Sequence, residues 1–264
     1  MKYKNKQINI FNISVFIVLI CFLPLFYYST KFLINNWGYA DAMINYSHGF
    51  IRRGLLGEII LWINQITLIK TSIIFSYFYI FITILNIFLY AIILKKISKN
   101  YLIFLFLFFN PALLFFILND TLGYMRKELI MVTLMLFHCW ICNSFHQKKI
   151  NLKKYLIYFY SLILPGIIIL TLMHDLQIFI IPFHFFLTLN IIDKKFNFLN
   201  IKSYFKKNSK HLYFYIVTII PIFIFILFPS DLEKLKLIYD DLLILDPQIW
   251  WDPIRFTANS FTNA

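Results

Sequence analysis

Long apolar runs alternate along this chain with short polar segments. A bilayer core about 30 Å thick requires roughly 20 mainly apolar residues in each helix that crosses it. Seven runs approach or meet that length, at residues 11–28, 71–94, 101–118, 123–142, 155–172, 176–192 and 211–228. The pattern therefore predicts an all-α fold, a polytopic transmembrane helix bundle of about seven spans.

One further apolar segment, residues 55–68, differs from the seven runs. It is too apolar for a solvated helix and too interrupted for a span, which is typical of a helix that lies along a membrane surface. We predict an interfacial helix here, in the first outer loop. Residues 1–230 then form the bundle, and residues 231–264 form an acidic tail outside the membrane, which we interpret as the start of a larger outer domain.

The composition agrees with a membrane protein. Hydrophobic residues make up 61% of the chain, charged residues only 14%, and the mean hydropathy is +0.74. These values exclude a disordered chain, a secreted disulfide scaffold and an ordinary cytosolic enzyme. The net charge of +13 would favour nucleic acid in a soluble protein. Here the basic residues lie between apolar runs, so we predict a bilayer partner and no nucleic acid.

The placement of charge predicts the orientation. Lysine-rich segments precede the first span and follow the second, fourth and sixth, which places the N-terminus in the cytoplasm and the C-terminus outside. We expect a multi-pass protein of the inner (plasma) membrane. All four arginines and nearly all carboxylates then lie outside or at outer helix ends. The outer face is therefore the predicted functional face.

The first outer loop carries the densest set of candidate groups. Asp41 is followed by His48 and by the pair Arg52 and Arg53, with glycines on both sides of that pair. Glycine lets a backbone approach a ligand closely, and guanidinium groups bind phosphate in bidentate fashion. The alternative is that both arginines extend to lipid headgroups.

Two more clusters lie on the same predicted face. Arg126, Lys127 and Glu128 begin the fourth span, and a helix N-terminus attracts anions; a structural ion pair is the alternative there. His174 and Asp175 form the turn between the fifth and sixth spans, where a histidine beside a carboxylate can transfer protons. A plain polar hairpin tip is the commoner case.

Other motifs carry less chemistry. The chain has no phosphate-binding glycine loop and no metal-ligand spacing, so we expect no cofactor, although scattered outer carboxylates leave a divalent metal open. Cys139 and Cys142 form a CxxC near the inner end of the fourth span, where the absence of a βαβ context disfavours a redox function. His184 is interpreted as a satisfied interior histidine.

The layout resembles the GT-C class of polytopic glycosyltransferases, which use polyprenyl-phosphate-linked sugars at the outer face. Asp41 matches the position of that class's catalytic acidic residue, and residues 55–68 match its interfacial helix. The sequence is also similar to O-antigen polymerases and related surface-polysaccharide proteins, which use external arginines on pyrophosphate-linked glycans. Both resemblances imply cell-surface glycan synthesis with a polyprenyl-phosphate-linked sugar as partner. A flippase or transporter for lipid-linked glycans, or a structural subunit, is the non-enzymatic alternative.

These inferences assign provisional roles. Asp41 is the leading candidate for the base that accepts the acceptor's proton, and Asp175 beside His174 is the runner-up. The predicted substrate-binding residues are Arg52, Arg53, Arg126, Lys127, Glu128 and His48. The oligomeric state, the sugar and the acceptor are left open.

Overall fold

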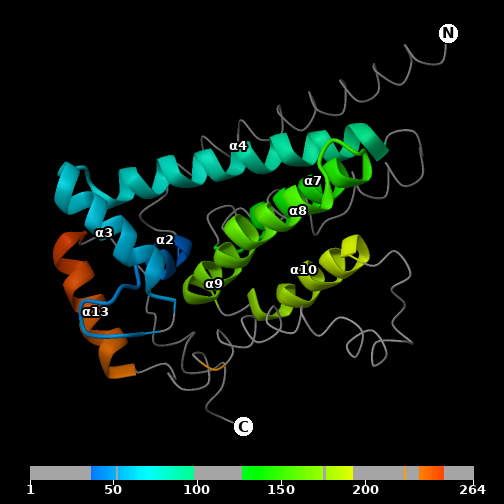
Figure 1. Cartoon of the computed structure of the whole chain (residues 1–264). Helices are drawn as coiled ribbons and strands as arrows, with labels where there is room; N and C mark the ends of the chain where they lie inside the picture. The colour runs from blue at the N-terminus through cyan, green and yellow to red at the C-terminus, as the bar shows by residue number, and fades with distance from the viewer. Residues whose placement is uncertain are drawn as a thin grey trace.

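The computed structural model describes residues 37–51, 53–97, 127–174, 177–192, 223 and 232–246. Within these ranges the ordered elements are all helical (Figure 1). In chain order they are α2 (Trp37–Ala42), α3 (Leu55–Thr67), α4 (Thr71–Ile97), α7 (Glu128–His146), α8 (Leu152–Tyr158), the π turn η3 (Phe159–Ile163), α9 (Leu164–Met173), α10 (Gln177–Ile192) and α13 (Leu232–Leu245). The all-α prediction is confirmed for this part of the chain.

Three described helices are long and apolar enough to cross a membrane: Thr71–Lys95, Glu128–His146 and Leu152–Met173. They correspond to the second, fourth and fifth predicted spans. The sixth prediction corresponds to α10, which is apolar but shorter. The predicted spans at 11–28, 101–118 and 211–228 lie outside the described residues, as does most of the predicted tail beyond α13.

Several of these helices meet at one end of the described bundle. Asp41, just before the loop that leads to α3 and α4, contacts Lys127 at the start of α7. His174, at the end of α9, lies beside Glu128 in the first turn of α7. The starts of α4 and α7 and the end of α9 therefore meet at one end of the bundle, together with α2, α3 and α13 (Figure 1).

The helix from Leu152 to Met173 contains a π turn. It ends two residues before Pro165, which has no N–H to donate to the carbonyl of Ser161, a residue inside the π turn. An inserted π turn is a common way for a helix to adjust its hydrogen bonding around such an interruption. The sequence alone does not distinguish this continuous, locally widened helix from a kink.

The segment at 55–67 forms the predicted helix α3, which ends at Leu68 in a left-handed conformation. One face packs inward through Leu56, Gly57 and Ile60. Large apolar side chains remain exposed on and just after the helix, and these are Ile59, Trp62, Ile66, Leu68 and Ile69. A helix with one face against a bundle and apolar groups on another suits a membrane interface.

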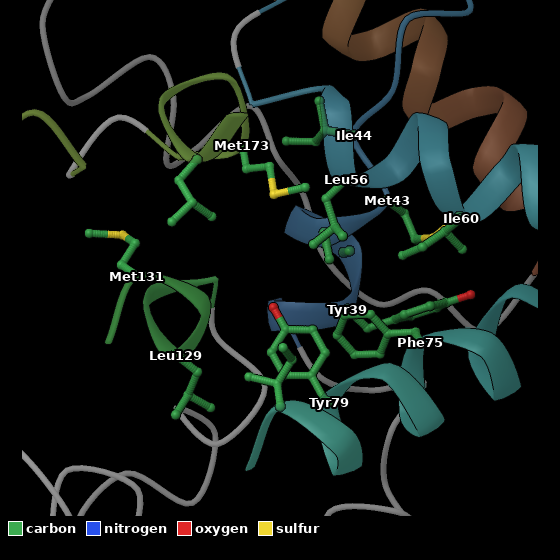
Figure 2. Packing of buried hydrophobic residues seen from close by; sticks show 14 of the residues in the cluster. Tyr39, Met43, Ile44, Leu56, Ile60, Phe75, Tyr79, Leu129, Met131 and Met173 are labelled. Carbon is green, nitrogen blue, oxygen red and sulfur yellow. The ribbon is translucent and has the colours of Figure 1, made fainter. Parts of the chain in front are cut away.

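A hydrophobic cluster at this end joins the helices (Figure 2). Tyr39 and Met43 of the α2 segment, Leu56 of α3, Phe75 of α4 and Leu129 of α7 are all nearly inaccessible to solvent. The helix α13 adds Leu235, Ile238 and Leu242, whose spacing of three and four residues places them on one face. Burial of this cluster holds the polar groups described below in place.

At Gly57, helix α3 packs closely against the backbone of Met43 and Ile44, which follow α2. A Cβ atom there would lie 2.1 Å from the carbonyl oxygen of Ile44 and 2.6 Å from that of Met43. Because both contacts are with backbone, Gly57→Ala has to displace α3 from the segment that follows Asp41. We expect a lower unfolding temperature and a lower yield of folded protein for this variant, measured by thermal denaturation in detergent.

Gly166→Ala is the matched control for that experiment. Its Cβ would lie 2.9 Å from Cδ1 of Leu134, the end of a flexible side chain. Adding a methyl group there requires only a small side-chain adjustment. Equal unfolding temperatures for the two variants would contradict the close backbone crossing at Gly57.

Candidate functional site

Asp41 lies near the end of the short helix α2 with only 6% of its surface exposed. Its Oδ2 atom is 3.2 Å from Nζ of Lys127, and its Oδ1 atom is 3.9 Å from a guanidinium nitrogen of Arg53. The structure thus joins the predicted base to members of two predicted phosphate-binding clusters.

Lys127 is the most deeply buried charged group of this set, with 1% of its side chain exposed. It precedes α7, and its ammonium group donates to the backbone carbonyl of Arg53 at 3.2 Å as well as contacting Asp41. These contacts make Lys127 the counter-charge of Asp41. Its predicted role in substrate binding is untested and stays a prediction.

The loop between Asp41 and Arg53 is held by local hydrogen bonds. Asn45 accepts from the N–H of Ser47 and donates to the carbonyl of Met43. Arg53 has a φ angle of 70°, in the left-handed region that non-glycine residues adopt rarely. Such a conformation costs of order 1–3 kcal/mol and persists where surrounding contacts fix it. Here the carbonyl of Arg53 is fixed by Lys127.

Burial and charge act in opposite directions on Asp41. Burial, the largest single influence, would raise the pKa of the carboxyl, but Lys127, Arg53 and His174 together hold that pKa below its ordinary value. Asp41 is therefore ionised at neutral pH. A carboxylate has to be ionised to accept a proton from an acceptor hydroxyl.

His174 approaches the same cluster from the end of α9. Its Nε2 atom is 3.7 Å from a carboxylate oxygen of Glu128, farther than a hydrogen bond. Burial is the largest influence on the pKa of His174 and lowers it, and the positive charges of Lys127 and Arg53 act in the same direction. Together they outweigh the carboxylates of Glu128 and Asp41, which raise that pKa. The imidazole is therefore neutral at neutral pH, and together with Asp41, Lys127, Arg53 and Glu128 it forms what we call the Asp41 cluster.

Of the remaining predicted site residues, His48 is the one that the structure places in a different setting. Its Nε2 atom is 2.8 Å from Oδ2 of Asp241 on α13. A Cβ atom added at Gly49 would lie 3.9 Å from Nζ of Lys234 on the same helix, so this lysine lies over the loop. These contacts attach α13 to the loop between α2 and α3. His48 contacts that helix through Asp241. Arg52, Arg126 and Asp175 lie outside the described residues.

Deeper in the bundle is a second polar network that the sequence did not indicate. His138 of α7 contacts His184 of α10 through the two Nδ1 atoms at 2.9 Å. The Nε2 atom of His138 is 2.9 Å from the hydroxyl of Tyr155, which in turn is 3.1 Å from the Thr188 hydroxyl. The Cys142 thiol also points to Tyr155.

The hydrogen positions in this network follow from the number of available donors. Thr188 donates its single proton to the carbonyl of His184, so it accepts from Tyr155, and Tyr155 accepts from Nε2–H of His138. Both imidazoles are completely buried, which disfavours a charge on either ring, and we therefore take both as neutral. His184 must then carry its proton on Nδ1, which leaves its buried Nε2 without a partner in the described part of the chain.

We therefore expect ¹⁵N NMR spectra of histidine-labelled protein to show the proton on Nε2 of His138 and on Nδ1 of His184. Tyr155→Phe removes the acceptor of the His138 proton and should change the His138 signals first. The opposite tautomers in the wild-type protein would contradict this hydrogen-bond order. His184 was predicted to have its hydrogen bonds satisfied. Nδ1 has a partner in His138, whereas Nε2 has none in the described part of the chain.

Within the described ranges, no three His, Cys, Asp or Glu side chains gather as metal ligands. No family model, curated protein or solved structure matches this chain.

Proposed function

We propose that this protein is a membrane glycosyltransferase that acts at the outer face on polyprenyl-phosphate-linked sugars in cell-surface glycan synthesis. The observation that carries the proposal is the Asp41 cluster: an ionised, buried carboxylate held by Lys127 and Arg53, with His174 and Glu128 beside it. These residues come from four separate segments that meet at one end of a set of apolar helices.

The proposed reaction is a direct displacement at the sugar's anomeric carbon. The acceptor oxygen forms the new bond, the bond from carbon to phosphate oxygen breaks, and its electron pair leaves with the polyprenyl phosphate. The hydroxyl proton passes to Asp41. General-base assistance of this kind contributes typically 10²- to 10⁴-fold to a rate.

The position of the cluster suits a lipid-linked donor. The exposed apolar side chains of α3, Trp62 and Ile66 among them, would lie in the membrane interface a short distance along the chain from Arg53. A phosphate at that level is within reach of arginines on the first outer loop, whose planar guanidinium groups suit it better than lysine does. Arg53, with Arg52 and Arg126, is the proposed phosphate-binding set.

Deletion of the gene in its host tests the proposal without knowledge of the sugar. A transferase predicts that the surface glycan is lost or shortened and that the lipid-linked precursor accumulates at the outer face. The wild-type gene should restore the glycan. Accumulation of the precursor at the inner face would instead indicate a flippase, and an unchanged surface glycan would contradict both functions.

A further inference from the structure

Two fully buried side chains beside the Asp41 cluster have polar atoms with no hydrogen-bond partner in the part of the chain that the structure describes. They are the hydroxyl of Tyr79 and both the amide nitrogen and oxygen of Gln177. Each side chain belongs to a residue with 0% of its surface exposed. A buried polar group left unpaired is destabilising because it has lost its hydrogen bonds to water. Such groups are rare in folded proteins, and each one calls for an explanation.

Tyr79 belongs to the α4 face that meets α2 and α7. Its ring packs on Phe75 with the centroids 4.5 Å apart, and Phe75 packs on Tyr39 of α2 at 5.1 Å. Figure 2 shows Tyr79 among these residues and Leu129 of α7. The Tyr79 hydroxyl lies within electrostatic range of the carboxylates of Asp41 and Glu128. It therefore faces the Asp41 cluster from the side of α4.

Gln177 approaches from the side of α10. It is the first residue of that helix, and its backbone N–H donates to the carbonyl of His174 at 3.2 Å. His174 in turn is the residue that faces Glu128. Gln177 therefore lies next to one member of the Asp41 cluster, to which its backbone is hydrogen-bonded three residues along the chain.

The polar groups of Tyr79 and Gln177 that have no partner among the described residues are uncharged. Asp41 and Lys127 satisfy each other's charge, whereas Tyr79 offers one donor and an acceptor, and Gln177 offers two donors and a carbonyl acceptor. A group that both donates and accepts, without charge, complements this set. Sugar hydroxyls have that chemistry and phosphate oxygens do not.

We propose that Tyr79 and Gln177 bind hydroxyl groups of the sugar that reacts beside Asp41. This inference rests on the proposed transferase function and adds to it a binding subsite for a neutral polyol. The two side chains stay desolvated and unpaired without substrate and gain partners when the sugar ring is bound. They are sugar-binding residues, distinct from the arginines proposed to hold the phosphate.

Isosteric variants test the proposal because stability and function should change in opposite directions. Tyr79→Phe and Gln177→Leu remove an unpaired buried polar group, so their unfolding temperatures should equal or exceed that of the wild-type protein. Surface-glycan synthesis, measured after complementing the deletion strain, should fall about five- to tenfold for each variant, because each removes hydrogen bonds to substrate.

Two controls match these variants. Tyr39→Phe makes the same chemical change at a hydroxyl that is already paired with Thr71 and Asp246, so it should lower the unfolding temperature. Thr83→Val removes another unpaired buried hydroxyl one turn farther along α4, and it should leave glycan synthesis unchanged.

The outcomes separate this inference from the function on which it rests. If deletion of the gene leaves the surface glycan unchanged, the transferase proposal fails. If deletion abolishes the glycan, and Tyr79→Phe and Gln177→Leu both restore it fully, the sugar subsite is wrong while the transferase stands. A marked fall in unfolding temperature for both variants would assign their polar groups to the fold and would also overturn the subsite.

Discussion

Replacing Lys127 with methionine is expected to lower the free energy of unfolding by about 3–5 kcal/mol, the range typical of a buried ion pair that loses one partner. The cost arises because the Asp41 carboxylate stays buried, with Arg53 at 3.9 Å as its nearest remaining positive charge. Equilibrium unfolding in mixed micelles measures it. Lys153→Met is the control: Lys153 is exposed, so the change should stay within about 0.5 kcal/mol.

The double variant Asp41→Asn/Lys127→Met separates charge from packing. Removing both charges together leaves no buried carboxylate without its ammonium partner, and Arg53, which loses Asp41, is partly exposed to solvent. The double variant should therefore regain much of the stability that Lys127→Met loses. Equal losses for the single and the double variant would show that Lys127 acts through packing alone. The pair would then have no electrostatic role.

The same ion pair predicts how stability depends on pH. Because the pKa of Asp41 is lowered in the folded protein, the unfolded chain binds its proton more readily in acid. The stabilisation is therefore fully present above the ordinary carboxyl pKa of 3.8 and is lost as the pH falls below that value. Lys127→Met should flatten this part of the stability profile.

Asp41→Asn is expected to lower the rate of sugar transfer by about 10²-fold or more, since asparagine has nearly the same shape but cannot accept a proton. The new amide still offers an oxygen to Lys127, yet the ammonium group loses its counter-charge, so a loss of folded protein could imitate a loss of catalysis. Activity must therefore be compared per folded molecule, and the double variant with Lys127→Met supplies the second comparison.

In the double variant the fold is expected to recover and the activity is not. Transfer should stay at least about 10²-fold below that of the wild-type protein, because no carboxylate remains at position 41. Binding of the lipid-linked donor should be retained, because the arginines proposed to hold the phosphate are unchanged. Full activity in the double variant would exclude Asp41 as the base and leave Asp175 as the remaining candidate.

The apolar pattern was sufficient to predict α3, α4, α7, α10 and the helix from Leu152 to Met173, but not α2 or α13 and not the point at which these helices meet. The helix α3 was predicted to within one residue of its end because the interruption of its apolar pattern is local information. Asp41, Lys127 and His174 were each selected as candidates, but as members of separate clusters. Their contacts join residues far apart in the chain, and periodicity along one helix carries no information about such distances.

Other site residues gave no signal in the sequence. Tyr79 lies in a span rich in aromatic residues, where one more tyrosine is not unusual, and its importance appears only when its hydroxyl is found buried without a partner in the described part of the chain. His138 was not a candidate in the sequence and becomes notable through its contact with His184. His48 was grouped with the arginines by proximity in the chain, but the folded chain brings it to Asp241 of α13.

The most direct test of the proposed mechanism is sugar transfer by the purified, reconstituted protein. Wild-type protein and the Asp41→Asn/Lys127→Met variant would be supplied with radiolabelled lipid-linked sugar extracted from membranes of the deletion strain, together with acceptor from the same cells. We expect the wild-type protein to release polyprenyl phosphate and label the acceptor, and the folded double variant to do so at least about 10²-fold more slowly. Equal rates for the two proteins, or no transfer by the wild-type protein, would contradict a transferase that uses Asp41 as its base.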